Sequence, residues 1–267
     1  MESSAIITGG ARGLGLAMAQ ELDRRGFGLV LIDRDFPDDF ERQHFRSNGS
    51  KLSLHPLDLA NRQSIQRTAQ RIANAHPEAS ILILNAGISS SVPFERLSVK
   101  EFDAVMQVNF FSAVQMTHAL LPQLKLAKQA RIVFISSDFA LLGFPGKSSY
   151  SASKGALNAF ANTLKTEYQG SNIAISIAIP PAMPTDIVAD GVHIGPDERM
   201  AEIAFLKKHG IPTTTVAAKI VPQILKGKFR IRIGWQIRIL DLLSRLAPSI
   251  VHSLIGAFKG TLPFYRN

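Results

Sequence analysis

Thr8-Gly9-Gly10-Ala11-Arg12-Gly13-Leu14-Gly15 is the stretch of sequence that decides the fold. It follows a short apolar run at residues 5–7 and opens a segment, 14–25, whose apolar side chains recur at helical spacing. Glycines between a strand and a helix permit a tight turn and let the backbone approach a pyrophosphate, while the helix N-terminus favours negative charge. This context predicts a dinucleotide-binding turn that includes Gly9, Arg12, Gly13, Leu14 and Gly15. Because no Gly-Lys-Ser/Thr follows, a P-loop phosphotransferase is disfavoured.

Outward from this turn, apolar runs of strand length alternate with longer segments of helical period. The runs lie at residues 29–32, 51–57, 81–84, 131–135 and 173–179, and the helical segments at 61–75, 99–126 and 150–168. Such alternation is typical of βαβ units, and continuous apolar strands indicate a sheet covered on both faces. We therefore expect one α/β domain over residues 1–267, built as a doubly wound, Rossmann-type parallel sheet of about seven strands with helices on both faces.

Composition narrows the classes of function. The chain has 267 residues, a net charge of +9 and no Cys, which excludes disulfides, thiolate nucleophiles and Cys-ligated metals. Its seven His form no metal-ligand spacing, so we expect no metal site. With no signal-peptide pattern and no apolar run of transmembrane length, we expect a cytoplasmic location. The basic charge leaves nucleic acid, an anionic membrane surface or acidic small molecules as partners.

Asp33 ends the second apolar run, 18 residues after Gly15 (33 − 15). A carboxylate at this position accepts hydrogen bonds from the adenine ribose of NAD and repels the 2′-phosphate of NADP. The alternative is an Asp that caps the next segment. Arg12 and Arg34 lie nearby in the sequence and are able to face a 2′-phosphate, so NAD is preferred and NADP stays open.

Tyr150 and Lys154 stand four residues apart, which places them on one face of a helix. A Tyr hydroxyl has a pKa near ~10, and a neighbouring ammonium and a positively charged nicotinamide lower that pKa, which makes Tyr150 a usable acid or base. Alone, such a pair is more often structural. Ser136-Ser137 strengthens the functional interpretation because it ends a strand at the sheet edge where doubly wound folds bind ligands.

These motifs together resemble the short-chain dehydrogenase/reductase family over residues 4–185. The glycine turn, Asn85-Ala86-Gly87, Ile135-Ser136-Ser137 and the Tyr150/Lys154 pair occur in the family's order, with the usual 13 residues (150 − 137) from serine to tyrosine. The resemblance implies an NAD(P)-dependent oxidoreductase that interconverts an alcohol with a ketone or aldehyde. It also implies that Ser137 positions the substrate oxygen, Tyr150 is the general acid/base that also contacts substrate, and Lys154 holds the nicotinamide ribose.

The same resemblance assigns further residues. Asn109 matches the fourth catalytic position, which supports a water leading to Lys154. Implied cofactor contacts, besides the glycine turn, Asp33 and Arg34, are Asp58, Leu59, Asn85, Ala86, Gly87, Tyr150, Lys154, Pro180 and Thr185. For Asp58, capping of the next helix is an alternative. The sequence departs from the family at Leu84, where a second Asn is usual, and at Pro181, where Gly is usual.

Residues 182–212 contain three Pro and mixed polarity, and a loop of this length predicts a substrate-binding lid. Its apolar residues predict a lipophilic substrate, although a lid with ordinary core contacts has the same pattern; they are Ile187, Val188, Val192, Ile194, Met200, Ile203, Phe205 and Leu206.

Residues 226–267 are basic and partly amphipathic, with strand-like alternation at 226–233 and helical spacing at 235–245. Peripheral contact with an anionic membrane and packing on another subunit or on the chain's own core are evenly matched interpretations. Nucleic acid is disfavoured because the charge is dispersed. The family implies a homodimer or homotetramer. A catalytically silent nucleotide-binding scaffold or regulator, possible at a membrane surface, is the alternative function, and the presence of all four catalytic residue types argues against it.

Overall fold

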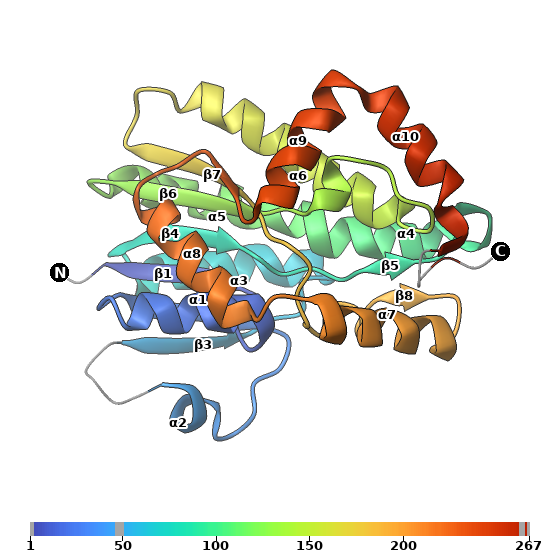
Figure 1. Ribbon diagram of the computed structural model, residues 1–267. Coiled ribbons are helices and arrows are strands. Elements are labelled where there is room, and N and C mark those ends of the chain that lie inside the picture. Colours follow the sequence, from blue (N-terminus) through green and yellow to red (C-terminus); the bar gives the residue numbers. More distant parts are fainter. Residues whose placement is uncertain (1–2, 46–50, 262–264, 266–267) are drawn as a thin grey trace.

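The computed structural model describes residues 3–45, 51–261 and 265. A seven-stranded parallel sheet forms its centre, in the order β3-β2-β1-β4-β6-β7-β9 (Figure 1). The strands are β1 (Ser4–Thr8), β2 (Gly28–Asp33), β3 (Leu52–Pro56), β4 (Ala79–Leu84), β6 (Ala130–Ile135), β7 (Ile173–Ile179) and β9 (Arg230–Arg232). The order reverses between β1 and β4, because β3 and β2 extend one way from β1 and the later strands extend the other way. This confirms the predicted doubly wound, Rossmann-type fold.

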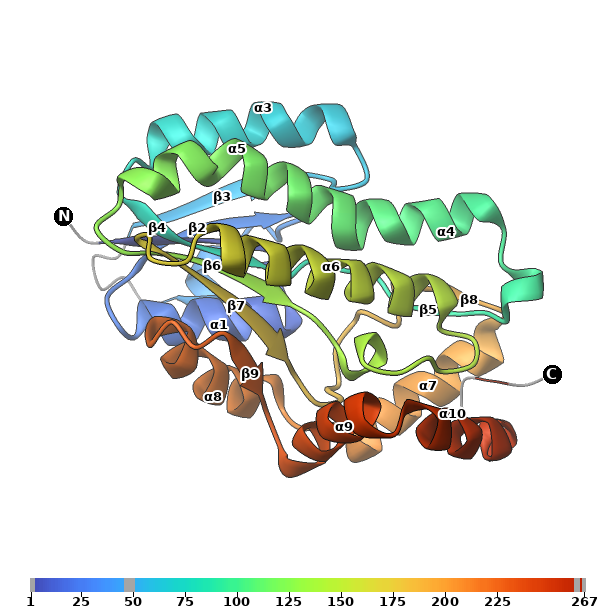
Figure 2. The ribbon, with the colours of Figure 1, turned by 90° about the horizontal axis from the view of Figure 1, so that it is seen from above.

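Helices cover both faces of the sheet (Figure 2). On one face lie α3 (Arg62–Ala75), α4 (Val99–Met106), α5 (Ser112–Leu126) and α6 (Ser148–Glu167), and on the other α1 (Gly13–Asp23) and α8 (Thr213–Leu225); a short α2 (Phe40–His44) follows β2. Each face has its own buried apolar cluster. Both faces of the central strands are therefore buried, which explains their continuous apolar runs.

The predicted helix at 99–126 is divided by a π-helical turn. α4 ends at Met106, residues Gln107–Phe111 are π-helical, and α5 then runs to Leu126. A π turn inside an α-helix is often found at functional sites, and this one contains Asn109. Pro122 lies inside α5, four residues before its last residue, Leu126.

The segment 182–212 is not the long loop that its sequence predicts. It contains β8 (Val192–His193), which pairs with β5 (Ser90–Ser91), and α7 (Pro196–His209). Pro196 begins α7, acidic Asp197 and Glu198 lie in its first turn, and basic residues lie in its last turn. Acidic residues near the N-terminus and basic residues near the C-terminus interact favourably with the helix dipole. Together with Pro196 they stabilise a helix that has little amphipathic pattern.

The C-terminal part also differs in detail from its pattern. Of the alternating run 226–233, only Arg230–Arg232 form a strand, because a turn at Gly227, with φ +66°, closes α8 first. α9 (Trp235–Leu246) and α10 (Pro248–Ala257) follow. Among the described residues no single helix is long and apolar enough to cross a membrane; α9 and α10 reach that composition only together, with a bend of 115° between them.

Candidate active site

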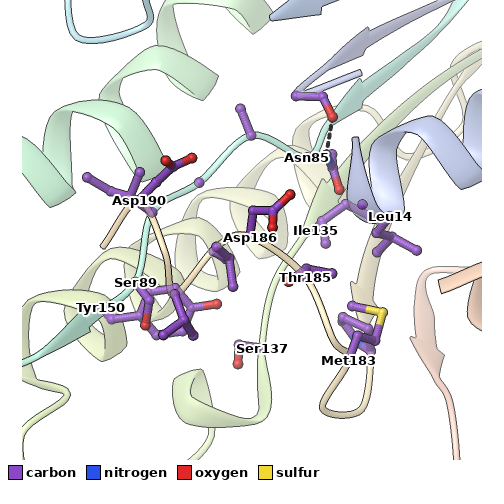
Figure 3. Close-up of a pocket in the computed structure, with 18 of the residues that line it drawn as sticks. Leu14, Asn85, Ser89, Ile135, Ser137, Tyr150, Met183, Thr185, Asp186 and Asp190 are labelled. Atoms are coloured by element: carbon purple, nitrogen blue, oxygen red, sulfur yellow. Dashed lines mark hydrogen bonds between the residues drawn. The ribbon is translucent and has the colours of Figure 1, made fainter. Parts of the chain in front are cut away.

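A cavity of about 630 Å³ opens where the central strands end at their carboxyl termini. Figure 3 shows Leu14, Asn85, Ser137, Tyr150 and Thr185 around it. Most residues assigned from the sequence line this cavity, namely Gly9, Arg12, Gly13, Leu14, Asp33, Arg34, Asp58, Leu59, Asn85, Ala86, Gly87, Ser137, Tyr150, Lys154, Pro180 and Thr185. Gly15 and Asn109 do not line it. Pro181, the departure from the family pattern, also lies in the wall.

The glycine turn is built so that backbone alone faces one end of the cavity. Gly9 and Gly13 have φ values of +66° and +57°, which other residues rarely adopt. A Cβ on Gly15 would lie 1.9 Å from the Gly9 carbonyl oxygen, so this glycine serves the close packing of α1 on the turn. The first turn of α1 thus brings its N-terminal N–H groups to the cavity.

Asn85 and Ala86, directly after β4, fix this turn. The Asn85 side-chain amide donates to the carbonyl oxygens of Thr8 and Gly9, at 3.0 and 3.1 Å. The backbone N–H groups of Asn85 and Ala86 both donate to Thr8 Oγ1, at 3.0 and 3.1 Å. The Asn-Ala-Gly motif therefore ties the ends of β1 and β4 together at the point where the strand order reverses.

Asp33 lies at the cavity's edge, and its carboxylate is held by backbone. Oδ2 accepts from the Ala11 N–H at 2.9 Å and Oδ1 from the Arg34 N–H at 2.8 Å. Each oxygen keeps acceptor capacity for a ligand, since a carboxylate offers about four lone-pair sites. The first of these bonds joins the end of β2 to the glycine turn.

Arg12 and Arg34 are both paired with carboxylates. The Arg12 guanidinium binds Asp190 and lies 3.9 Å from Asp186, while Arg34 Nε donates to Asp35 at 2.8 Å. Both arginines already have carboxylate partners. A 2′-phosphate would therefore have to displace existing ion pairs in order to bind either of them. The two aspartates after β7 carried no signal in the sequence that linked them to the glycine turn.

Asp58 follows β3 at the same rim, and its carboxylate accepts from the Ala60 N–H at 2.9 Å. The helix α3 that follows is capped by Asn61, whose Oδ1 accepts from the Ser64 N–H. The alternative in which Asp58 caps that helix was wrong.

Ser137, Tyr150 and Lys154 converge on one side of the cavity. Ser137 follows β6, and its hydroxyl donates to Asp138 Oδ1 at 2.9 Å and accepts from the Phe139 N–H. Tyr150, in the first turn of α6, is 7% exposed. Lys154 Nζ lies 5.8 Å from the centroid of the Tyr150 ring and donates to the Ile135 carbonyl at 2.9 Å.

Burial dominates the electrostatics of this group. It raises the pKa of Tyr150, the carboxylates of Asp138 and Glu202 add to the rise, and the neighbouring Ser137 hydroxyl opposes it. Burial also lowers the pKa of Lys154 to about 8. The protein's own groups therefore raise the Tyr150 pKa instead of lowering it, and the lowering by a bound, positively charged nicotinamide stays a prediction.

Asn109, from the π turn, is buried next to the cavity but does not line it. It is 1% exposed, its Oδ1 accepts from the Ile88 N–H at 2.8 Å, and its amide donates to the Ile88 carbonyl and to Ser153 Oγ, both at 3.0 Å. A Cβ on Gly87 would lie 3.2 Å from Asn109 Oδ1 and 3.3 Å from Lys154 Nζ. Asn109 and Gly87 thus hold the loop after β4 close to α6.

The other end of the cavity is mainly apolar. Of the residues predicted for a lid, Ile187, Val188, Phe205 and Leu206 line it; Val192, Ile194, Met200 and Ile203 do not. Sequence reasoning missed Phe139, Phe144 and Met183, which follow β6 or β7 and complete the apolar wall.

Sequence reasoning also missed a buried polar cluster, because its members are far apart in the chain. Lys147 Nζ donates to Glu202 Oε1 and Ser91 Oγ, each at 2.5 Å, and to Ser89 Oγ at 3.2 Å. Lys147 is 0% exposed and Glu202 is 4% exposed. Glu202 and Ser89 line the cavity, and the cluster attaches α7 to the start of α6.

The described residues contain no group of three His, Asp or Glu arranged to hold a metal ion.

The fold has close counterparts among solved structures. A short chain dehydrogenase/reductase from Burkholderia phymatum in complex with NAD matches with a TM-score of 0.80 and 22% identity, covering 95% of each chain. A short chain dehydrogenase from Burkholderia cenocepacia in complex with NADP matches with a TM-score of 0.76 and 20% identity, covering 95% of this chain and 97% of the other. At these sequence identities the structural similarity shows the fold alone.

Sequence comparison gives the family. The chain is 30% identical to a dehydrogenase/reductase SDR family protein 7-like of Drosophila melanogaster, covering 92% of this chain and 77% of that protein. It is 27% identical to the putative oxidoreductase SadH of Mycobacterium tuberculosis, over 95% and 94%, and 27% identical to the mouse 3-ketodihydrosphingosine reductase, over 97% and 82%. The model of the short chain dehydrogenase family matches residues 3–193. The chain belongs to the short chain dehydrogenase family, and it is an oxidoreductase of that type.

Proposed function

We propose that this oxidoreductase interconverts an alcohol with a ketone or aldehyde, uses NAD in preference to NADP, and acts on a lipophilic substrate. The observation that carries the proposal is the convergence of Ser137, Tyr150 and Lys154 on a cavity whose opposite end is the glycine turn. One cavity thus joins a proton-transferring group to a surface suited to a dinucleotide.

The residues of the cavity fit a nicotinamide dinucleotide. Gly9 and Gly13 expose backbone beside the N-terminus of α1, which suits a pyrophosphate, and a Cβ at position 15 would clash with the Gly9 carbonyl oxygen. Asp33 would hold the adenine ribose and Lys154 the nicotinamide ribose. When bound, the nicotinamide supplies or accepts a hydride, and its oxidised form adds a positive charge.

The charges around Asp33 favour NAD. Asp33, Asp35 and Asp190 all lie close to the two arginines, so the cationic groups here are already neutralised. A 2′-phosphate adds about two negative charges, and it would have to meet the Asp33 carboxylate. Related structures bind NAD or NADP, so this preference comes from the residues of this chain.

The protein's own groups carry the proton chemistry. The hydroxyl of Ser137, which donates to Asp138 Oδ1 in the structure, would rotate to donate a hydrogen bond to the substrate oxygen. Tyr150 gives its proton to that oxygen when a carbonyl is reduced and takes it back when an alcohol is oxidised. Because burial raises the pKa of Tyr150, it carries its proton at neutral pH, which suits reduction. Asn109 is a positioning residue, since its side chain contacts Ile88 and Ser153.

Apolar walls support a lipophilic substrate. The part of the cavity beyond Tyr150 is lined by Phe139, Phe144, Phe205 and Leu206. A hydrocarbon group gains about 25 cal/mol for each Å² of surface removed from water, so such walls favour long or bulky apolar substrates.

The test is hydride transfer measured by nicotinamide absorbance over a panel of alcohols and carbonyls that includes apolar ones. Tyr150→Phe should lower kcat by about 10²–10⁴-fold, with NAD affinity by calorimetry nearly unchanged. Tyr168→Phe is the matched control, since Tyr168 ends the same helix away from the cavity. A Tyr150→Phe variant with kcat near that of the parent rejects the mechanism. NAD binding without turnover of any panel member favours the scaffold alternative.

A further inference from the structure

Helices α9 and α10 present an unusual surface. Its large apolar side chains are Trp235, Ile239, Leu242, Leu243, Leu246, Ile250 and Leu254, with exposed fractions from 41% to 72%. We call these seven side chains the α9–α10 surface. A contiguous exposed apolar area on two successive helices is uncommon in a monomeric soluble protein and marks an interaction site.

The orientation of α9 is the reverse of that of an ordinary surface helix. Its charged side faces the protein, because Asp241 is 0% exposed and is bound by Arg230 and Arg232 of β9 and by Arg245. The apolar residues at 235, 239, 242, 243 and 246 share the other side at helical spacing. The buried carboxylate and its arginines fix this orientation, so the apolar stripe cannot turn inward without breaking ion pairs.

This geometry argues against packing of the C-terminal segment on the chain's own core. A helix that packs on its own core directs its apolar stripe inward, and here only Ile237 of α9 joins the buried apolar cluster. Some of the arginines of this segment, which its sequence allowed to face solvent or a membrane, instead face the protein. Arg230, Arg232 and Arg245 all bind the buried Asp241. The apolar side chains, rather than these arginines, form the outward face.

We propose that the α9–α10 surface docks onto an anionic lipid bilayer and lies in the bilayer interface. Exposed Arg238 and Lys259 border the apolar side chains, and residues 235–261 carry three cations, Arg238, Arg245 and Lys259, against one carboxylate, Asp241. Apolar side chains with basic neighbours and an exposed Trp235 are the features of interfacial helices. The pair has the composition of a membrane span, and its bend of 115° is compatible with both helices lying along a bilayer surface.

A second copy of the chain is the competing occupant. In a two-fold contact the same patch meets itself, so the net positive charge of each patch would face like charge. An anionic bilayer complements that charge instead. Charge complementarity therefore favours the bilayer.

The surface adjoins the wall of the cavity. α9 contacts the 3₁₀ turn Asp138–Ala140, and Phe139 of that turn lines the apolar end of the cavity. Figures 1 and 2 both place α7, α9 and α10 toward the end of the molecule where the strands finish. Docking in this orientation would bring the apolar end of the cavity near the bilayer, which suits the lipophilic substrate of the proposed function.

The experiment is flotation of the full chain with phosphatidylcholine vesicles, with and without 30% phosphatidylserine as the probe. We expect flotation with the anionic vesicles. Arg238→Glu and Lys259→Glu should each weaken partitioning about fivefold or more, because a cation near such a surface contributes about fivefold. Leu242→Asp/Leu246→Asp should abolish flotation. Leu126→Asp, at an 86% exposed Leu on α5, is the matched control and should float like the parent.

Circular dichroism establishes that each variant is folded, and light scattering gives its oligomeric state. Absence of flotation by the parent protein, or flotation of Leu242→Asp/Leu246→Asp equal to that of the parent, overturns the proposal. So does a parent dimer that this double variant converts to monomers, since the surface then binds a second copy. Flotation needs no turnover, so its failure is distinguishable from failure of the proposed dehydrogenase function.

Discussion

Replacement of Lys147 by Met removes one partner of the buried Lys147–Glu202 ion pair. Both side chains are almost fully buried, at 0% and 4% exposure, so water does not screen the change. Glu202 would keep the hydrogen bond from Ser91 but lose its cation. Removing one partner from a buried pair costs about 3–5 kcal/mol, since the remaining charge is left in a poorly solvated place.

The double variant Lys147→Met/Glu202→Leu removes both charges. Its stability should lie within about 1–2 kcal/mol of that of the parent, because replacing a whole buried pair by apolar residues is often neutral. The double-mutant cycle should therefore give a coupling energy of at least about 4 kcal/mol between the two residues, because each single variant loses about 3–5 kcal/mol and the double variant loses at most about 2 kcal/mol. In a chain of this size, the loss in Lys147→Met corresponds to a fall in Tm of about 6–20 °C, from about 2–4 °C per kcal/mol.

Urea unfolding followed by circular dichroism measures these free energies. Lys165→Met, an exposed position on the same helix, is the control and should change stability by less than about 0.5 kcal/mol. A loss below about 1 kcal/mol in Lys147→Met, or a double variant less stable than either single variant, refutes the reasoning that the two charges depend on each other. Since Glu202 lies on α7, a loosened pair should also raise KM more than it lowers kcat.

Three further changes address the dinucleotide end of the cavity. Asp33→Ser should weaken NAD binding about 10–100-fold by calorimetry, because it removes charged acceptors for ribose hydroxyls, and should strengthen NADP binding; unchanged affinities contradict the role of Asp33. Because burial lowers the pKa of Lys154 to about 8, the ammonium is lost as pH rises through 8, so the Kd for NADH by fluorescence should rise above that pH and stay flat in Lys154→Met. Gly15→Ala should abolish NAD binding and lower Tm, since its Cβ would meet the Gly9 oxygen, whereas Gly155→Ala, with open space around it, should leave both nearly unchanged; equal behaviour of the two variants refutes the packing argument.

The sheet and the dinucleotide end of the cavity were predictable because their signals are local. Each of Gly9, Asp33, Asn85 and Ser137 stands directly at the end of an apolar run, and parallel strands bring their carboxyl ends to one edge. The spacing along the chain therefore placed these residues together before any coordinates were known.

The substrate end was less predictable because its contacts join distant segments. Lys147 and Glu202 are 55 residues apart, and a Lys or Glu is usually exposed to solvent, so nothing in the sequence links the two side chains. α7 has almost no amphipathic pattern, so only Pro196, its acidic first turn and its basic last turn indicated a helix. The inward-facing Asp241 was hidden in the same way, since nothing in its own helix shows that β9 supplies its arginines.

The Tyr150 pKa shows why residue spacing alone does not give the electrostatics of a site. The sequence places Lys154 four residues from Tyr150, and that spacing alone predicts a lower pKa. In the structure Lys154 Nζ donates to the Ile135 carbonyl, and burial lowers the pKa of Lys154 to about 8, so its positive charge is lost above that pH. The same burial raises the pKa of Tyr150, with Asp138 and Glu202 on the same side. Reduction then needs nothing more from the protein than the proton already on Tyr150. Oxidation needs added positive charge beside the phenol, so alcohol oxidation should depend more steeply on alkaline pH than carbonyl reduction does.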